Sequence, residues 1–185
     1  VPAIAYAGSK VSAFQKETRL GANYWSGGSA IDGKMDTAWM VPGESANRGE
    51  WIEIDIPAGT VDKISAVIGY AASDETFKDY GRLKQARIDI FTINDDQMPV
   101  QVGTANVSFE DKSGLQTVDV PDVKVGSDLA GGKVRISVMD LYTGQDYPNM
   151  GISEVAVVMG EFNVTPTKLQ SVSGEGAGHG KDLAL

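Results

Sequence analysis

A short segment with two acidic residues and a threonine, AIDGKMDTAW at residues 30–39, carries the strongest chemical signal in this sequence. Asp32-Gly33 is typical of a tight turn, because glycine adopts positive φ and an aspartate side chain can hydrogen-bond to nearby backbone. Asp32, Asp36 and Thr37 place hard oxygen atoms within six residues, which suits a calcium ion with its roughly six to eight oxygen ligands. A solvated hairpin turn that binds no ion would contain the same Asp-Gly pair, so both interpretations stay open.

Aromatic residues in polar loops are the second signal. Tyr24-Trp25 lies in a polar, glycine-rich stretch. Sugars present weakly apolar C–H faces rimmed by hydroxyl groups, so a sugar site needs an aromatic platform and a few planar or charged hydrogen-bonding groups. The candidate platforms are Tyr24, Trp25, Tyr80 and Tyr147, and the candidate polar partners are Asn23, Arg82, Asp146 and Asn149. The alternative is that these aromatic side chains only cover the open end of a β-sandwich.

A basic cluster, Arg82, Lys84 and Arg87, stands out in an otherwise acidic chain. Such a cluster could bind the carboxylate or sulfate of an acidic sugar through charge-assisted hydrogen bonds. The same residues could instead pair with nearby acidic side chains, as surface charges usually do.

Catalysis has little support in the sequence. The only histidine, His179, lies between glycines in a glycine- and serine-rich tail, where nothing would orient it as a general base. A Ser-His-Asp arrangement is therefore not expected, and no pair of acidic residues stands in an apolar setting that would raise a pKa. The sequence predicts a protein that is not an enzyme.

Composition limits the fold and the partners. The 185 residues suit one domain with short ends, and the 22 glycines, 7 prolines and 42% hydrophobic content are typical of many short strands joined by turns. A net charge of −9 disfavours nucleic acid and anionic membrane surfaces as partners. No apolar run reaches the roughly 18 residues that membrane insertion requires.

Alternating apolar residues predict the strands, as in the WIEIDI segment, where Ile52, Ile54 and Ile56 share one face. The seven expected strands are 51–56, 63–70, 84–93, 100–107, 115–120, 133–142 and 152–159. The expected core includes Ile52, Ile54, Ile56, Ile88, Ile136 and Val157, whereas Trp39 and Trp51 are expected to pack beside strands. We expect a lead-in at 1–20, one β-sandwich at 21–165, and a flexible tail at 166–185.

Several motifs recur in an order that resembles a known superfamily. AIDG and DTAW are followed by GEWIEIDI, IGY, the tyrosine and basic run YGRLK, and YTGQDYPNMGISE near the end. This order resembles the discoidin-like, galactose-binding-like superfamily, which includes coagulation-factor type C domains and many carbohydrate-binding modules. The segment 22–159 is most similar to the bacterial NADase-type glycan-binding domain. Lys34-Met35 and YGR depart from the usual motif pattern of that domain. The details of the binding face are therefore expected to differ, but the architecture is not.

The resemblance implies an all-β, antiparallel jelly-roll β-sandwich in which the first turn and the last strand meet. It also implies a structural calcium held by Asp32 through a carboxylate, Thr37 through its hydroxyl and carbonyl, Asp36 mainly through its backbone carbonyl, and Glu154 through a carboxylate. The ion would tie two distant segments together.

The function that follows is a non-catalytic glycan-binding module of a secreted, periplasmic or surface-exposed bacterial protein, with a glycan or polysaccharide as partner. A protein-interaction or adhesion module that binds a protein receptor is one alternative, and an accessory domain of a larger enzyme is another. Ala5-Tyr6-Ala7 has the small-x-small form of a signal-peptidase site, which agrees with secretion.

Overall fold

The computed structural model describes residues 5–7, 27–41, 50–126 and 130–165. The strands are β1 (Ala5–Ala7), β2 (Trp39–Val41), β3 (Trp51–Ile56), β4 (Gly59–Val67), β5 (Arg82–Ile93), β6 (Pro99–Ser108), β7 (Gln116–Val125), β8 (Gly132–Tyr142), β9 (Met150–Ile152), β10 (Glu154–Met159) and β11 (Phe162–Asn163). The helical segments are η1 (Gly27–Ala30) and α2 (Asp74–Asp79).

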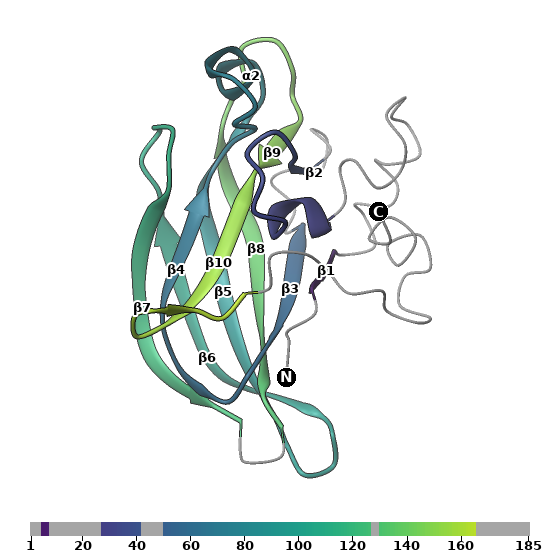
Figure 1. Cartoon of the computed structure of the whole chain (residues 1–185), viewed down its shortest axis with the longest axis vertical. Coiled ribbons are helices and arrows are strands. Elements are labelled where there is room, and N and C mark those ends of the chain that lie inside the picture. The colour runs from purple at the N-terminus through teal and green to yellow at the C-terminus, as the bar shows by residue number, and fades with distance from the viewer. Residues whose placement is uncertain (1–4, 8–26, 42–49, 127–129, 166–185) are drawn as a thin grey trace.

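Two antiparallel sheets pack into a sandwich (Figure 1). One sheet has five strands in the order β1-β3-β8-β5-β6, and the other has four in the order β11-β10-β4-β7. A separate pair, β2 and β9, lies beside the sandwich near its upper end. The predicted all-β, antiparallel sandwich is confirmed.

The core lies between the sheets and consists largely of branched aliphatic side chains. The expected core residues are all buried, namely Ile52, Ile54, Ile56, Ile88, Ile136 and Val157. Trp39 is also fully buried, and the half-buried Trp51 lies beneath the Arg135 guanidinium, 4.5 Å from it. Both tryptophans therefore pack as expected.

Some strand boundaries differ from the prediction for local reasons. β4 begins four residues earlier than expected, at Gly59, and ends at Val67. β7 continues to Val125 through Pro121, which an edge strand tolerates because its outer face needs no amide donor. The last expected strand divides at Ser153, whose amide donates to the carbonyls of Val67 and Gly69, so that the chain changes partners there.

The sequence analysis did not predict the short strand β1 or the short helix α2. β1 lies within the expected lead-in and pairs with residues 52–54 of β3. Helix α2 has six residues, too few for a visible helical period, but it has a complete N-terminal cap: Ser73 and Thr76 each bond to the backbone amide of the other. Buried Phe77 anchors α2 to the sandwich. The helix and the loop between β8 and β9 lie together at the upper end of the molecule (Figure 1).

Candidate functional site

The Asp-Gly turn closes on itself. Gly33 adopts φ +75°, a conformation that side chains rarely take. The amide of Lys34 donates to Oδ1 of Asp32 at 2.9 Å. The hydroxyl of Thr37 donates to the other carboxylate oxygen of Asp32. Asp32 and Thr37 therefore face each other across the turn, as the sequence analysis expects.

The last strand of the sandwich meets this turn. β2 pairs with β9, and Ser153 then fixes the contact, because its hydroxyl donates to the Met35 carbonyl at 3.0 Å and accepts the Ala71 amide at 2.9 Å. The next residue is Glu154, whose carboxyl group lies close enough to Asp32 and to the amides of Gly33 and Lys34 for them to affect its pKa. We call residues 32–37 together with Glu154 the carboxylate loop.

The carboxylate loop is electrostatically strained. Burial, with the nearby charge of Asp32, raises the pKa of Glu154 to about 8, although the two turn amides oppose the shift. Burial also raises the pKa of Asp32, against the bonds from Thr37 and Lys34. Oε1 of Glu154 is buried and has no hydrogen-bond partner. Two carboxyl groups thus meet with too few donors to keep both charged.

The donor set of the carboxylate loop fits a hard cation. A buried carboxylate oxygen without a donor is what a metal ion would satisfy. Within the described part of the chain, no group of three or more acidic or histidine side chains could hold a metal. The remaining ligands would have to be the Thr37 hydroxyl and backbone carbonyls. Asp36 is exposed, so only its carbonyl, which accepts the Tyr70 hydroxyl at 3.4 Å, can contribute.

A pH dependence of stability follows for the metal-free protein. The folded-state pKa of Glu154, about 8, lies above its ordinary value of 4.5, so unfolding releases a proton between these pH values. Stability from Glu154 is therefore fully present below about pH 4.5 and is lost as pH rises through about 8. We expect Glu154→Gln to flatten this decline in melts recorded in chelator from pH 5 to 9. An equally steep decline in the variant would contradict the assignment.

Three tyrosines meet at the upper end of the sandwich. The rings of Tyr80 and Tyr147 stack with centroids 4.6 Å apart and an interplanar angle of 22°. Tyr70 meets Tyr80 edge-on at 5.5 Å. Tyr147 is 47% exposed, so much of its ring faces solvent. We call Tyr80 and Tyr147, with the carboxyl groups of Asp79 and Asp146, the tyrosine rim.

Backbone hydrogen bonds hold the tyrosine rim in place. The amides of Asp146 and Tyr147 both donate to the Asp79 carbonyl, at 3.1 and 2.9 Å, and Gln145 donates to Lys78 at 2.9 Å. Gly144 allows this close approach, because a Cβ atom there would lie 2.3 Å from the Asp79 carbonyl oxygen. The Tyr147 ring is therefore presented by a loop with a fixed course, which lowers the entropic cost of binding.

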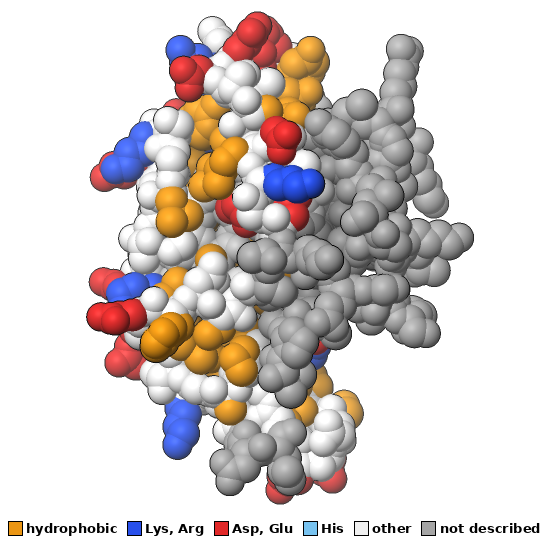
Figure 2. All heavy atoms as spheres, viewed as in Figure 1, with side chains coloured by type: hydrophobic (Ala, Val, Ile, Leu, Met, Phe, Trp, Pro, Cys, Tyr) orange, Lys and Arg blue, Asp and Glu red, His pale blue; other side chains and the backbone are white. Residues whose placement is uncertain are grey.

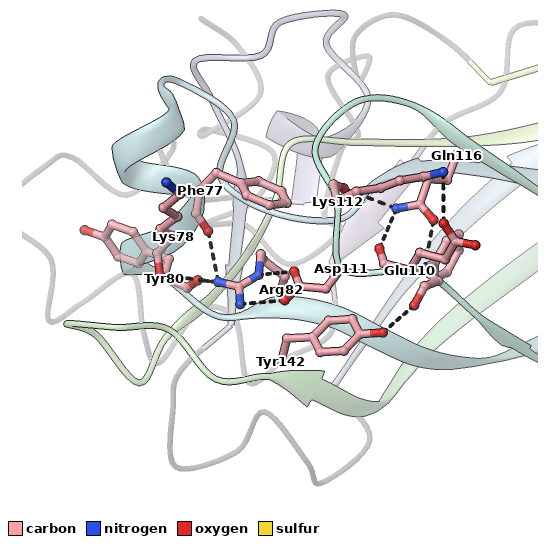
Figure 3. A network of polar contacts seen from close by, with 10 residues as sticks. Phe77, Lys78, Tyr80, Arg82, Glu110, Asp111, Lys112, Gln116 and Tyr142 are labelled. Atoms are coloured by element: carbon pink, nitrogen blue, oxygen red, sulfur yellow. Dashed lines mark hydrogen bonds and ion pairs between the residues drawn. The ribbon is translucent and has the colours of Figure 1, made fainter.

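Arg82 has a different role from the one expected. Its side chain is buried and forms a two-pronged ion pair with Asp111, at 2.6 and 3.1 Å. Its Nη1 donates to the carbonyls of residues 77, 78 and 80 (Figure 3). All three guanidinium nitrogens are thus engaged within the chain. Arg82 joins α2 to the loop between β6 and β7 and is not available to a ligand.

The other basic residues also have acidic partners. Lys84 lies 3.9 Å from Asp140, and Arg87 lies 2.9 Å from Asp89. Both contacts agree with the alternative of surface pairing that the sequence analysis left open.

Some of the remaining candidate sugar-binding residues lie at the tyrosine rim, and others lie outside the described residues. Tyr80, Asp146 and Tyr147 come together on the rim, and half-buried Asn149 lies nearby, where its carbonyl accepts the Gly81 amide at 2.7 Å. Asn23, Tyr24 and Trp25 lie outside the described residues. Sequence reasoning missed Tyr70, Asp79 and Ser153. The IGY and ISE motifs contain Tyr70 and Ser153, but no spacing in the sequence places Asp79 beside Asp146.

Comparisons with known proteins agree on the fold. The NAD glycohydrolase translocation F5/8 type C domain model matches residues 5–158. An F5/8 type C domain from Bacteroides fragilis superposes with a TM-score of 0.59 at 17% identity, over 86% of this chain and 93% of the other. CpGH89CBM32-5 from Clostridium perfringens, solved with GalNAc-β-1,3-galactose, gives 0.52 at 15% identity, over 84% and 94%.

A part of a much larger protein is also similar. The mycobacterial arabinofuranosyltransferase AftD superposes with a TM-score of 0.56 at 18% identity, over 89% of this chain but only 12% of the transferase. No curated protein sequence matches. None of the described helices is long and apolar enough to cross a membrane. From the family match over most of its length, the chain belongs to the NAD glycohydrolase translocation F5/8 type C domain family.

Proposed function

We propose that this protein is a non-catalytic glycan-binding module of a secreted or surface-exposed bacterial protein, and that it binds sugar at the tyrosine rim. The observation that carries the proposal is the fixed stack of Tyr80 and Tyr147 at the loop end, with one ring open to solvent. A sugar can stack its C–H face on such a ring. Asp146 and Asn149, within two residues of Tyr147 in the sequence, would bond the hydroxyl groups at its edge.

Similarity to other proteins supports the same proposal. The fold is shared with a clostridial carbohydrate-binding module that was solved with a disaccharide. The family description also names translocation of an enzyme, which fits a protein that acts outside the cell.

Truncating the exposed tyrosine tests the site. We expect Tyr147→Ala to weaken sugar binding about tenfold, or ~1.4 kcal/mol, because the open stacking surface is lost. Tyr147→Phe keeps the ring and should bind nearly as well as wild type. Isothermal titration with the best ligand from a glycan array measures both variants. Since Tyr147 is half exposed, both should melt close to wild type, and unchanged binding by Tyr147→Ala would exclude the rim.

We also propose that a structural calcium ion occupies the carboxylate loop. Asp32 and Glu154 would supply carboxylate oxygens, Thr37 its hydroxyl and carbonyl, and Asp36 its backbone carbonyl. The buried, donor-free oxygen of Glu154 opposite Asp32 supports this set. The ion would neutralise the two carboxylates and join the first turn of the domain to its last strand, a structural role.

The family description favours one second candidate, an accessory domain that helps an attached enzyme to cross a membrane or reach its target. In that case the loop end would contact a protein receptor. A glycan array separates the two, because a sugar-binding module gives reproducible, competable signals and a protein-directed module gives none.

A further inference from the structure

Charge around the tyrosine rim is strongly one-sided. The two segments that build it, residues 74–79 and 143–149, contain Asp74, Glu75, Asp79 and Asp146 against Lys78 alone, which is a net charge of −3 (1 basic minus 4 acidic). Figure 2 shows acidic side chains at the upper end of the molecule, with a basic side chain beside them and a hydrophobic group next to them. Any ligand on the Tyr147 ring must lie within this negative field.

Two carboxyl groups lie on the residues that directly precede the stacked rings, Asp79 before Tyr80 and Asp146 before Tyr147. The amide of Asp146 donates to the carbonyl of Asp79 at 3.1 Å, which holds the two residues side by side. Each carboxylate accepts hydrogen bonds from hydroxyl groups and repels another anion. This combination suits the hydroxyl groups of a neutral sugar.

Apart from Lys78, which is included in the net charge above, the basic residues at this end are paired with acidic side chains. Arg82 is held by Asp111 at 2.6 Å, and Lys112 lies 3.0 Å from Glu110 (Figure 3). Lys84 has Asp140 as its acidic neighbour. Each of these cations is matched by a carboxylate of its own, and the two-pronged pair of Arg82 leaves it no donor pair for a sulfate or carboxylate.

We propose that the tyrosine rim selects neutral sugars and rejects those that carry carboxylate or sulfate groups, with Asp79 and Asp146 as the residues that determine the selection. This inference rests on the proposed function. Asp79 and Asp146 directly precede the two stacked tyrosines, so an anionic group on the ring would meet the charges of both, and each repulsion is modest in water but adds to the other. Exposed charges are screened by salt, so the selection should weaken as ionic strength rises.

The test compares matched ligands on one protein. Titrations would use a neutral galactoside, or the neutral array glycan that binds best, and the same sugar with a 6-sulfate, at 20 and 500 mM NaCl. We expect wild type at low salt to bind the neutral sugar at least about tenfold more tightly. The gap should shrink at high salt and in Asp79→Asn/Asp146→Asn. The control Asp95→Asn/Asp96→Asn removes two charges from the exposed turn between β5 and β6. This control should leave the difference in affinity between the neutral and the sulfated sugar unchanged.

The outcomes separate the inference from the proposed function. Equal or tighter binding of the sulfated sugar by wild type would overturn the selection while leaving a glycan-binding module. A gap of the same size in Asp79→Asn/Asp146→Asn would also overturn it, because the repulsion would then come from elsewhere. Binding to neither class of sugar would overturn the proposed function and the selection together.

Discussion

Chelation of calcium should lower the melting temperature of the wild-type protein, and Asp32→Ala should melt at the same temperature with and without chelator. An ion that binds only the folded chain stabilises it by RT ln(1 + [L]/Kd), about 2.7 kcal/mol at a hundredfold excess over Kd. Glu154 magnifies the effect, because its buried carboxylate faces Asp32 and lacks a donor at Oε1. Without the ion, the two groups must repel each other or take up a proton.

Asp36→Ala is the matched control for this experiment. The Asp36 side chain is exposed and would contribute only its carbonyl, so the variant should keep the full response to calcium. The response should also grow with pH, because the metal needs both carboxylates ionised. Identical wild-type melts with and without chelator, after carried-over metal has been removed, would count against a calcium site.

Replacing Arg82 should cause the largest loss of stability. We expect Arg82→Met to cost about 3 kcal/mol, because it leaves three backbone carbonyls without their donor and removes the ion pair of the buried guanidinium with the exposed Asp111. Chemical denaturation measures the loss. Lys84→Met is the control: its pair with Asp140 is half exposed and 3.9 Å long, so it should cost less than about 1 kcal/mol.

The Arg82 variant also discriminates between the two roles considered for this residue. If Arg82→Met unfolds like wild type but no longer binds an acidic sugar, the residue contacts ligand as the sequence suggested, and the ion pair with Asp111 is unimportant. A less stable protein whose sugar preference is unchanged would support the structural role.

The strands with clean alternation were predictable, because one face of each must be buried. The WIEIDI strand and the long strands β5, β6 and β8 follow the sequence pattern to within about two residues. β1, β2, β9 and β11 have only two or three residues, too few for any period to appear. The break at Ser153 depends on which carbonyls accept its amide, and that is a property of the assembled sheet.

Motifs in the sequence indicated some of the residues that lie together at the candidate sites, whereas other neighbours depend on contacts that the sequence does not show. The resemblance implied that the Asp-Gly turn would meet Glu154, and the structure brings them together. Tyr80 and Tyr147 were candidates separately, but their stacking depends on the closed loop after β8. Arg82 looked available in sequence, since nothing there shows that Asp111 on another loop would bind it.

Tyr70 connects the two proposed sites. Its hydroxyl donates to the carbonyl of Asp36 in the carboxylate loop, and its ring supports Tyr80, on which Tyr147 stacks. If the two proposed sites bind an ion and a sugar, a side chain shared in this way would couple the two binding events. If calcium raises the affinity for sugar by some factor, saturating sugar must raise the affinity for calcium by the same factor. Tyr70→Phe would then bring this factor closer to one while leaving both sets of ligands in place.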